Sequence, residues 1–287
     1  MWTLVFRGLA TGSIYSLTAM GIVLVLSTTN VMNFAQGDMG MFLAFIAFAL
    51  LLRHVSYPIA ILAVVVVGLL LGALLERGLM AKVRKTTSHL GMLIVTLALT
   101  MILEGLAGYF FGTTPLLFPP ALQGDPLHVF GAILDRQDLL SLAVAGVVVF
   151  ILFLVLYRTK IGIASRSLAE DEYAAKLLGI PVRSIYIFIW ATSFGLAGLA
   201  GIMVAPKLSL EPGFMIVIQL KAFIAAVLGG MNSVVGAVVG GLLLGVMENL
   251  VAYYVPQIKD SFSLILVVLV LLFLPEGLFG RRAARRA

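Results

Sequence analysis

Residues 139–157 form one uninterrupted apolar run, LLSLAVAGVVVFILFLVLY. The run contains no charged side chain, and its polar groups are confined to Ser141 and Tyr157. A helix that crosses the hydrocarbon core of a bilayer needs about 20 mostly apolar residues. The length and composition of this run therefore predict a transmembrane helix.

The rest of the chain has the same character. Of its 287 residues, 62% are hydrophobic and only 11% are charged, and the mean hydropathy is +1.15. Soluble domains are about 45–50% apolar and about 25% charged. A soluble surface cannot accommodate this excess of apolar side chains, which excludes soluble enzymes, nucleic-acid-binding proteins and disordered proteins. We expect a single membrane domain over residues 1–287.

Similar apolar stretches recur along the chain. They occupy residues 4–28, 37–52, 58–76, 89–111, 139–157, 184–205, 214–231, 233–252 and 261–280. They predict an all-α polytopic membrane protein with about eight to ten transmembrane or half-spanning helices. The number is a range because 37–52 is short and because 214–231 and 233–252 are almost contiguous. Each of these two places is typical of either a tight helical hairpin or a helix broken at mid-depth.

The positive charges indicate which loops face the cytoplasm. Thirteen of the 19 Lys and Arg residues lie in 77–88, in 158–183 and in the tail after Phe279. The alternate loops contain only Arg53, Arg136, Lys207 and Lys259. Because Lys and Arg concentrate in cytoplasmic loops, we expect these three segments, including the C-terminus, to be cytoplasmic, and 112–138 to lie outside. The side of the N-terminus depends on the break at 29–37.

Candidate catalytic and metal-binding groups are scarce. The chain has no cysteine, and its three histidines, His54, His89 and His128, are far apart in the sequence. Neither thiol chemistry nor a metal site is therefore expected, and no phosphate-binding loop pattern is present. A transporter with this composition must use an ion gradient or an ATPase on a separate chain. We expect no catalytic residue and no cofactor in this one.

The second predicted cytoplasmic loop has an amphipathic pattern that predicts a helix over residues 168–178. Its first turns, from Glu170, are acidic, which suits the positive end of a helix dipole. Gly179 follows at the position of a C-cap. Ala174 and Ala175 would give the helix a smooth face. A solvated interfacial helix and a docking helix for a cytosolic motor both fit this pattern.

Several motifs occur in an order that resembles one protein family. In chain order they are NFAQG at 33–37, Glu76-Arg77, AAKLLGI at 174–180, KAFIAAVLGG at 221–230, GAVVGG at 236–241 and PEGLFG at 275–280. Together they resemble the permeases of branched-chain amino-acid importers, which are ABC importers supplied by a periplasmic binding protein. The resemblance covers nearly the whole chain.

The resemblance implies a permease subunit in the bacterial inner membrane that moves branched-chain or related amino acids. It implies four kinds of partner: a second homologous permease, two cytosolic ABC ATPases, a periplasmic substrate-binding protein and the lipid bilayer. ATP and Mg²⁺ would be bound by the ATPases, and the loop residues Glu170, Ala174, Ala175 and Gly179 would contact them. Two alternatives remain: a permease for urea or short-chain amides, and an ion-coupled secondary transporter that uses Glu104 and Glu248.

Polar residues inside the apolar stretches are the candidates for a translocation path, because charges in a membrane usually face a bundle interior or a cavity. Asn33 and Gln36 either line such a path or order the start of the next helix, where Asn33 or Asp38 would be the cap. The family often has His in place of Gln36, and an uncharged residue in place of Glu104. Glu104 is expected in the outer half of its helix, in a vestibule, at an interface or at a substrate site.

Lys221 and Glu248 are expected to pair across the hairpin near the outer interface, or else to form a gate or a ligand contact. The glycines Gly236, Gly240, Gly241 and Gly245 place small residues four apart. That spacing predicts close packing of two helices on one face, either within the chain or between permeases.

Overall fold

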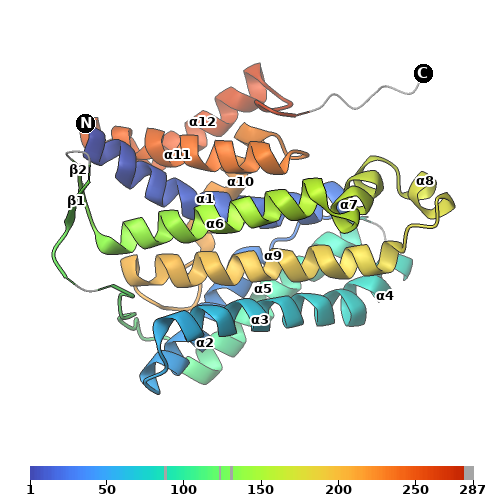
Figure 1. Ribbon diagram of the computed structural model, residues 1–287, viewed down its shortest axis with the longest axis horizontal. Coiled ribbons are helices and arrows are strands. Elements are labelled where there is room, and N and C mark those ends of the chain that lie inside the picture. The colour runs from blue at the N-terminus through green and yellow to red at the C-terminus, as the bar shows by residue number, and fades with distance from the viewer. Residues whose placement is uncertain (87–88, 123, 130–131, 281–287) are drawn as a thin grey trace.

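The computed structural model describes residues 1–86, 89–122, 124–129 and 132–280. Long helices such as α1, α3, α6 and α9 run along the longest axis of the molecule (Figure 1). The helices are α1 (Trp2–Thr29), α2 (Gln36–Leu52), α3 (Tyr57–Leu75), α4 (Ala81–Thr86), α5 (His89–Phe111), α6 (Arg136–Arg158), α7 (Lys160–Glu170), α8 (Glu172–Leu177), α9 (Val182–Val204), α10 (Ile216–Gly229), α11 (Val234–Tyr254) and α12 (Lys259–Phe273). A π-helical turn, η1 (Glu76–Met80), joins α3 to α4, and the 3₁₀ turns η2 (Ala205–Lys207) and η3 (Pro256–Ile258) follow α9 and α11.

The all-α prediction is confirmed. Among the described residues, six helices are long and apolar enough to cross a membrane, and three shorter apolar helices lie in α2, α10 and α12. Together they coincide with the nine apolar stretches of the sequence. Strand structure consists of a small antiparallel hairpin, β1 (Leu127–Val129) and β2 (Ala132–Leu134), in the segment between α5 and α6.

In the apolar stretch 261–280, the helix is shorter than the sequence predicts. Helix α12 ends at Phe273 because Pro275 and Gly277 follow, and Gly277 has a φ of +74°. The chain then turns back, and the Leu278 and Phe279 amides donate to the carbonyls of Leu228 and Gly229 at 2.9 Å. This segment therefore satisfies carbonyl groups that the end of α10 leaves unpaired.

Two of the short helices begin inside the bundle. The Gln36 side chain at the start of α2 contacts Ser193, which lies at the middle of α9. Gln219, in the first turn of α10, contacts Gly37. The break before α2 is thus at mid-depth, whereas α10 and α11 form the expected tight hairpin, with a turn at 230–233. Of the two interpretations offered by the sequence, the helix break at mid-depth applies to 37–52, and the tight hairpin applies to 214–252.

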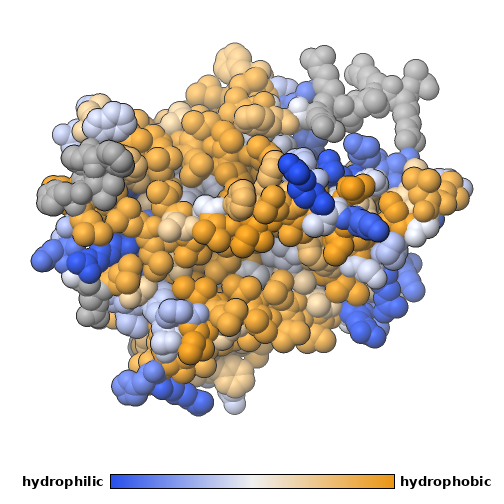
Figure 2. Space-filling model, in the orientation of Figure 1, coloured by the Kyte–Doolittle hydropathy of each residue, from blue (hydrophilic) through white to orange (hydrophobic). Residues whose placement is uncertain are grey.

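Burial divides the helices into a central group and an outer group. In α1 and in the α9–η2 segment, 83% of the most apolar window is buried, against 22% in the spans that contain α3, α5 and α6. Apolar residues cover the middle of the visible surface, and hydrophilic residues gather toward its two ends (Figure 2). This is the distribution expected where outer helices face lipid tails.

The loops predicted to be cytoplasmic and those predicted to lie outside are at opposite ends of the molecule. Helices α4, α7 and α8 lie at one end, on the right in Figure 1, while the N-terminus and the β1–β2 hairpin lie at the other. Two of the three positively charged segments therefore share one end. The third, the basic tail from Arg281 to Arg286, lies outside the described residues.

The glycine series packs within the chain, but on two helix faces and not on one. Gly236 and Gly240 lie against Gly229 and Ala225 of α10, whereas Gly241 and Gly245 lie against Ser16 and Gly12 of α1. The reason is that residues 236 and 241, five positions apart, point to different sides of a helix. The single-face prediction was therefore wrong, and the close packing is confirmed.

Gly245→Ala is expected to destabilise the protein by about 1–3 kcal/mol, because its Cβ would overlap backbone atoms of Gly12. Gly146→Ala on α6 is the matched control, since a Cβ there meets no atom within 4 Å. The measurement is the midpoint of thermal unfolding in detergent. Equal midpoints for the two variants would contradict the close α1–α11 contact.

Candidate functional site

A buried polar cluster surrounds the start of α2. The Asn33 amide donates to Gln36 Oε1 at 3.2 Å, and the Gln36 amide donates to the Ser193 carbonyl at 2.9 Å. The Ser193 hydroxyl lies 2.6 Å from Gln36 Oε1 and 3.0 Å from the Gly21 carbonyl. All three side chains are fully buried. The cluster thus joins α1, α2 and α9 at mid-depth.

Gln219 of α10 completes the cluster from the opposite side. Its Oε1 accepts from the Gly37 amide, and its Nε2 donates to the Phe34 carbonyl. Helix starts leave backbone amides without partners, and no water is available in a bilayer to satisfy them. Gln219 therefore stabilises the break before α2. The sequence analysis missed Gln219 and Ser193; a lone amide in an otherwise apolar helix start was the available signal.

The capping hypothesis for Asn33 and Asp38 needs correction. The N-cap of α2 is Ala35, without a side-chain hydrogen bond, and Asp38 lies within the first turn. Asn33 Oδ1 instead accepts from the Ala35 amide at 3.1 Å, so Asn33 orders the loop before the helix. A role of Asn33 and Gln36 in lining a path stays a prediction.

Lys221 and Glu248 form a buried ion pair, as expected from the sequence. The Tyr15 hydroxyl donates to the second oxygen of Glu248 at 2.9 Å. Since Tyr15 lies at the middle of α1, the pair is deep in the bundle and not near the outer interface. The expected depth was wrong because α10 begins inside the bundle, which brings Lys221 with it.

Glu104 lies in the second half of α5 and is partly exposed. Its Oε1 is 3.4 Å from the position that a Cβ on Gly213 would take. Gly213 belongs to the segment between η2 and α10, which pairs with α5's outer extension through Leu116 and Leu210. Glu104 is therefore next to the irregular segment that leads into α10.

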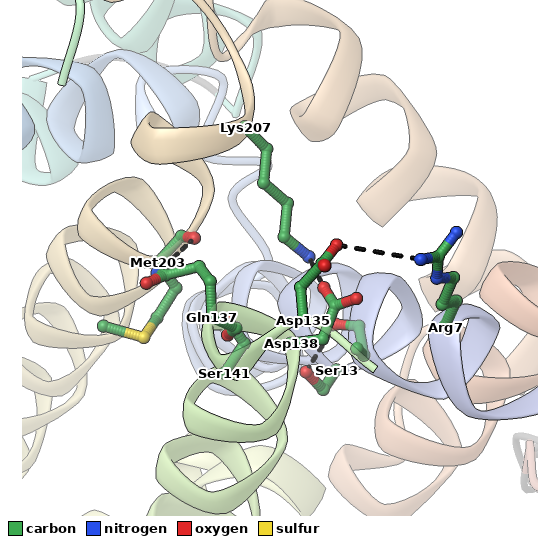
Figure 3. A network of polar contacts seen from close by, with 9 residues as sticks. Arg7, Ser13, Asp135, Gln137, Asp138, Ser141, Met203 and Lys207 are labelled. Atoms are coloured by element: carbon green, nitrogen blue, oxygen red, sulfur yellow. Dashed lines mark hydrogen bonds and ion pairs between the residues drawn. The ribbon is translucent and has the colours of Figure 1, made fainter. Parts of the chain in front are cut away.

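A second polar network joins α1, α6 and α9 at the end of the molecule opposite α8 (Figure 3). Lys207, after α9, forms an ion pair with Asp138 on α6, and the Gln137 amide donates to the Met203 carbonyl at 3.4 Å. Arg7 on α1 lies 3.9 Å from Asp135, where α6 begins. The sequence analysis counted Lys207 only as a loop charge. Its partner shows that it holds α6 against the end of α9.

The loop at the opposite end contains two helices where one was expected over 168–178. Asp171 interrupts the helix between α7 and α8, and its side chain accepts from the Ala174 amide at 3.0 Å. Asp is a strong N-cap residue, which explains why α8 begins only at Glu172. Gly179 has a φ of +76°, in agreement with its predicted role at the helix end.

The exposed face of α8 differs from the one expected. Ala174 is exposed, but Ala175 is only 1% exposed, because it packs against the chain itself. The exposed apolar side chains are instead Tyr173, Leu177 and Leu178, each more than 70% exposed. Glu170 lies at the end of α7 and lines a cavity with Arg166. The smooth two-alanine face is therefore absent from α8.

Charged and aromatic side chains connect α8 with the rest of this end. Arg84 makes two hydrogen bonds to the fully buried Glu76, at 2.8 and 2.9 Å, and its guanidinium lies 4.0 Å above the Tyr186 ring. Tyr186 in turn hydrogen-bonds to Glu172, which also pairs with Lys176 at 2.6 Å. Burial raises the pKa of Glu172, but these hydrogen bonds and the nearby cations outweigh it and lower the pKa below its usual value.

Metal-binding chemistry has no candidate site in the part of the chain that the structure describes, where no three His, Asp or Glu side chains gather. The buried polar groups described above hold neighbouring helices together.

Lys221→Met is expected to destabilise the protein by about 3–5 kcal/mol, because it leaves the Glu248 charge buried without a partner. The double variant Lys221→Met, Glu248→Leu should regain most of this loss, since both charges are then absent. The measurement is thermal unfolding of the purified chain. Additive losses in the double variant would contradict a direct pair.

Comparison with known proteins places this geometry in a family. Residues 4–274 match the family described as branched-chain amino acid transport system / permease component. The high-affinity branched-chain amino acid transport system permease protein BraD of Pseudomonas aeruginosa is 33% identical, over 96% of this chain and 94% of that one. The probable branched-chain amino acid transport permease protein LivH of Methanocaldococcus jannaschii is 32% identical, over 92% and 88%. The ribose import permease protein RbsC of Escherichia coli is 26% identical, over 92% and 84%. Six apolar helices and these matches together show that the chain is a multi-pass membrane protein of the branched-chain amino acid transport permease family.

Proposed function

We propose that this chain is the permease subunit of an ATP-driven importer for branched-chain amino acids. The observation that carries the proposal is the match to two branched-chain amino acid permeases at 32–33% identity over nearly the whole of each chain. The deep polar cluster around Gln36 and Gln219 supports it, because a permeation route needs irregular, polar backbone at membrane depth.

The proposed complex contains a second, homologous permease, two cytosolic ATPases and a periplasmic substrate-binding protein. ATP and Mg²⁺ would be bound and ATP hydrolysed on the ATPases, so this chain would need neither a cofactor nor a catalytic residue. The exposed side chains Tyr173, Leu177 and Leu178 support the ATPase contact, since apolar residues that project at a water-facing end are typical of a protein interface.

The arrangement suggests how a movement of the ATPase would reach the membrane. Helix α8 connects to α9 through the Glu172–Tyr186 contact, and α9 carries Ser193, which binds Gln36 at the start of α2. A displacement of α8 would thus be transmitted along one rigid helix to the mid-depth cluster. Arg84 and Glu76 would move with it, because Arg84 lies on the Tyr186 ring.

The proposal is tested by purifying an affinity-tagged chain from its native membrane and identifying what copurifies with it. We expect two P-loop ATPase subunits per pair of permeases and, after reconstitution with the binding protein, ATP-dependent uptake of leucine, isoleucine or valine. Uptake of urea or acetamide in place of these amino acids would favour the amide alternative. Uptake without any ATPase would contradict the proposal.

Tyr173→Asp and Leu177→Asp are expected to reduce copurification of the ATPase and the binding-protein-stimulated ATP hydrolysis together, by about tenfold. Such a loss corresponds to about 1.4 kcal/mol of interface energy, which burial of either side chain supplies. Tyr253→Asp is the matched control, because Tyr253 is similarly exposed (62%) at the end of α11 away from α8. Normal copurification in both α8 variants would remove this helix from the interface.

The orientation of the chain is tested with single cysteines, since the chain has none of its own. Ser167→Cys on α7 is expected to react with a membrane-impermeant maleimide only after the cells are permeabilised. Thr114→Cys, in the segment after α5, should react in intact cells. The opposite pattern would contradict a cytoplasmic α7–α8 end.

A further inference from the structure

One oxygen of a carboxyl group buried in the membrane domain lacks a hydrogen bond. Asp38, in the first turn of α2, is only 3% exposed, and its Oδ1 makes no hydrogen bond. The positive end of the helix dipole favours negative charge at this position. A buried carboxylate oxygen without a hydrogen bond nevertheless costs free energy, and a cation bound at this place would offset that cost.

The polar groups close to Asp38 come from one face of α5. They are Thr100 and Glu104, and Thr96, one turn before Thr100, donates to the Met32 carbonyl in the break before α2 at 3.2 Å. Residues 96, 100 and 104 are four apart and therefore share a helix face. This face places a second carboxyl group beside the first.

A third element closes the site. The Gly213 amide donates to Met41 Sδ at 2.9 Å, and Met41 follows Asp38 by nearly one turn of α2. Glu104 Oε1 lies next to Gly213 on the other side. The segment before α10 thus touches both the helix that carries Asp38 and the carboxylate of Glu104. Two acidic side chains, two threonines and a thioether surround this place.

No cationic side chain pairs with Asp38 or Glu104 within the described residues. The ion pairs there join Arg7 with Asp135, Arg84 with Glu76, Lys176 with Glu172, Lys207 with Asp138 and Lys221 with Glu248, and none includes Asp38 or Glu104. An isolated charge at the bilayer centre costs about 2.5–3.5 kcal/mol on insertion scales. Such groups usually face the bundle interior or a water-filled cavity, where they mark substrate and ion pathways.

We propose that Asp38 and Glu104 bind the ammonium group of the amino acid as it crosses the membrane. The ligand that fits is a primary ammonium, because it can donate a charge-assisted hydrogen bond to each carboxylate. The threonine hydroxyls provide further acceptors. This inference rests on the proposed function, which it extends by naming the part of the substrate that is recognised.

The first test measures uptake in the reconstituted complex. Asp38→Asn and Glu104→Gln keep the shape of each side chain and remove its charge. Each is expected to lower leucine uptake at least tenfold, about the factor of one charge-assisted hydrogen bond, while the ATPases remain bound. Glu211→Gln is the matched control, because Glu211 is a partly exposed carboxyl group of the same segment as Gly213. Uptake within twofold of the unmodified complex in both acidic variants would overturn the proposal, since it would show that a neutral group suffices.

The second test does not depend on transport. A hydrophobic carbodiimide modifies intramembrane carboxyl groups, and mass spectrometry of the purified chain locates the adducts. Leucine amide, which carries the ammonium group, is expected to protect Asp38 and Glu104, whereas 4-methylpentanamide, which differs from it only in lacking the amino group, is not. Absence of labelling, or equal protection by the two compounds, would overturn the site. Protection in a complex that does not import leucine would keep the site and reject the proposed function.

Discussion

The requirement that every backbone polar group in a bilayer find a partner within the protein constrains this fold more than any other. Long helices such as α1 and α9 meet it by themselves. Helices α2 and α10, however, begin inside the bundle, where their first amides have no water to bind. The side chain of Gln219 reaches from α10 to the Gly37 amide, and Gln36 reaches from α2 to α9. The break before α2 is therefore stabilised by a side-chain amide that belongs to another helix, α10.

This arrangement depends on close approach between helices. Gln36 fits only because Gly21 has no side chain, and α1 meets α11 where Gly12 lies against Gly245. In lipid, association gains little from the hydrophobic effect, so contacts between small residues and buried hydrogen bonds hold the helices together. The Lys221–Glu248 pair with Tyr15 adds an electrostatic contact at the same depth. The centre of the molecule is accordingly rigid, while its outer helices present apolar side chains.

A rigid centre suits a subunit that receives movement at one end. The α8 segment is held by Asp171 at its start and by the Glu172–Tyr186–Arg84 contacts along its side. Far from it, Lys207 and Gln137 attach α6 to the C-terminal end of α9. Helix α9 is thus fastened at both ends and contacts the mid-depth cluster between them. A change at α8 has a direct mechanical route to the start of α2.

Local composition decided which segments are helices, because an apolar run of span length has no stable alternative in a bilayer. The stretches around residues 139–157 and 58–76 illustrate this, and the Lys and Arg distribution separated the two ends in the same way. Depth and contact could not be read from the chain, because they depend on where another helix passes. The sequence placed Lys221 near the outer interface and Ala175 on an exposed face, yet Lys221 lies deep in the bundle beside Tyr15, and Ala175 is buried. The packed bundle alone brings residues far apart in the sequence into contact. The roles of Gln219, Ser193 and the Asp38–Glu104 pair depend on such contacts and could not be predicted from the sequence.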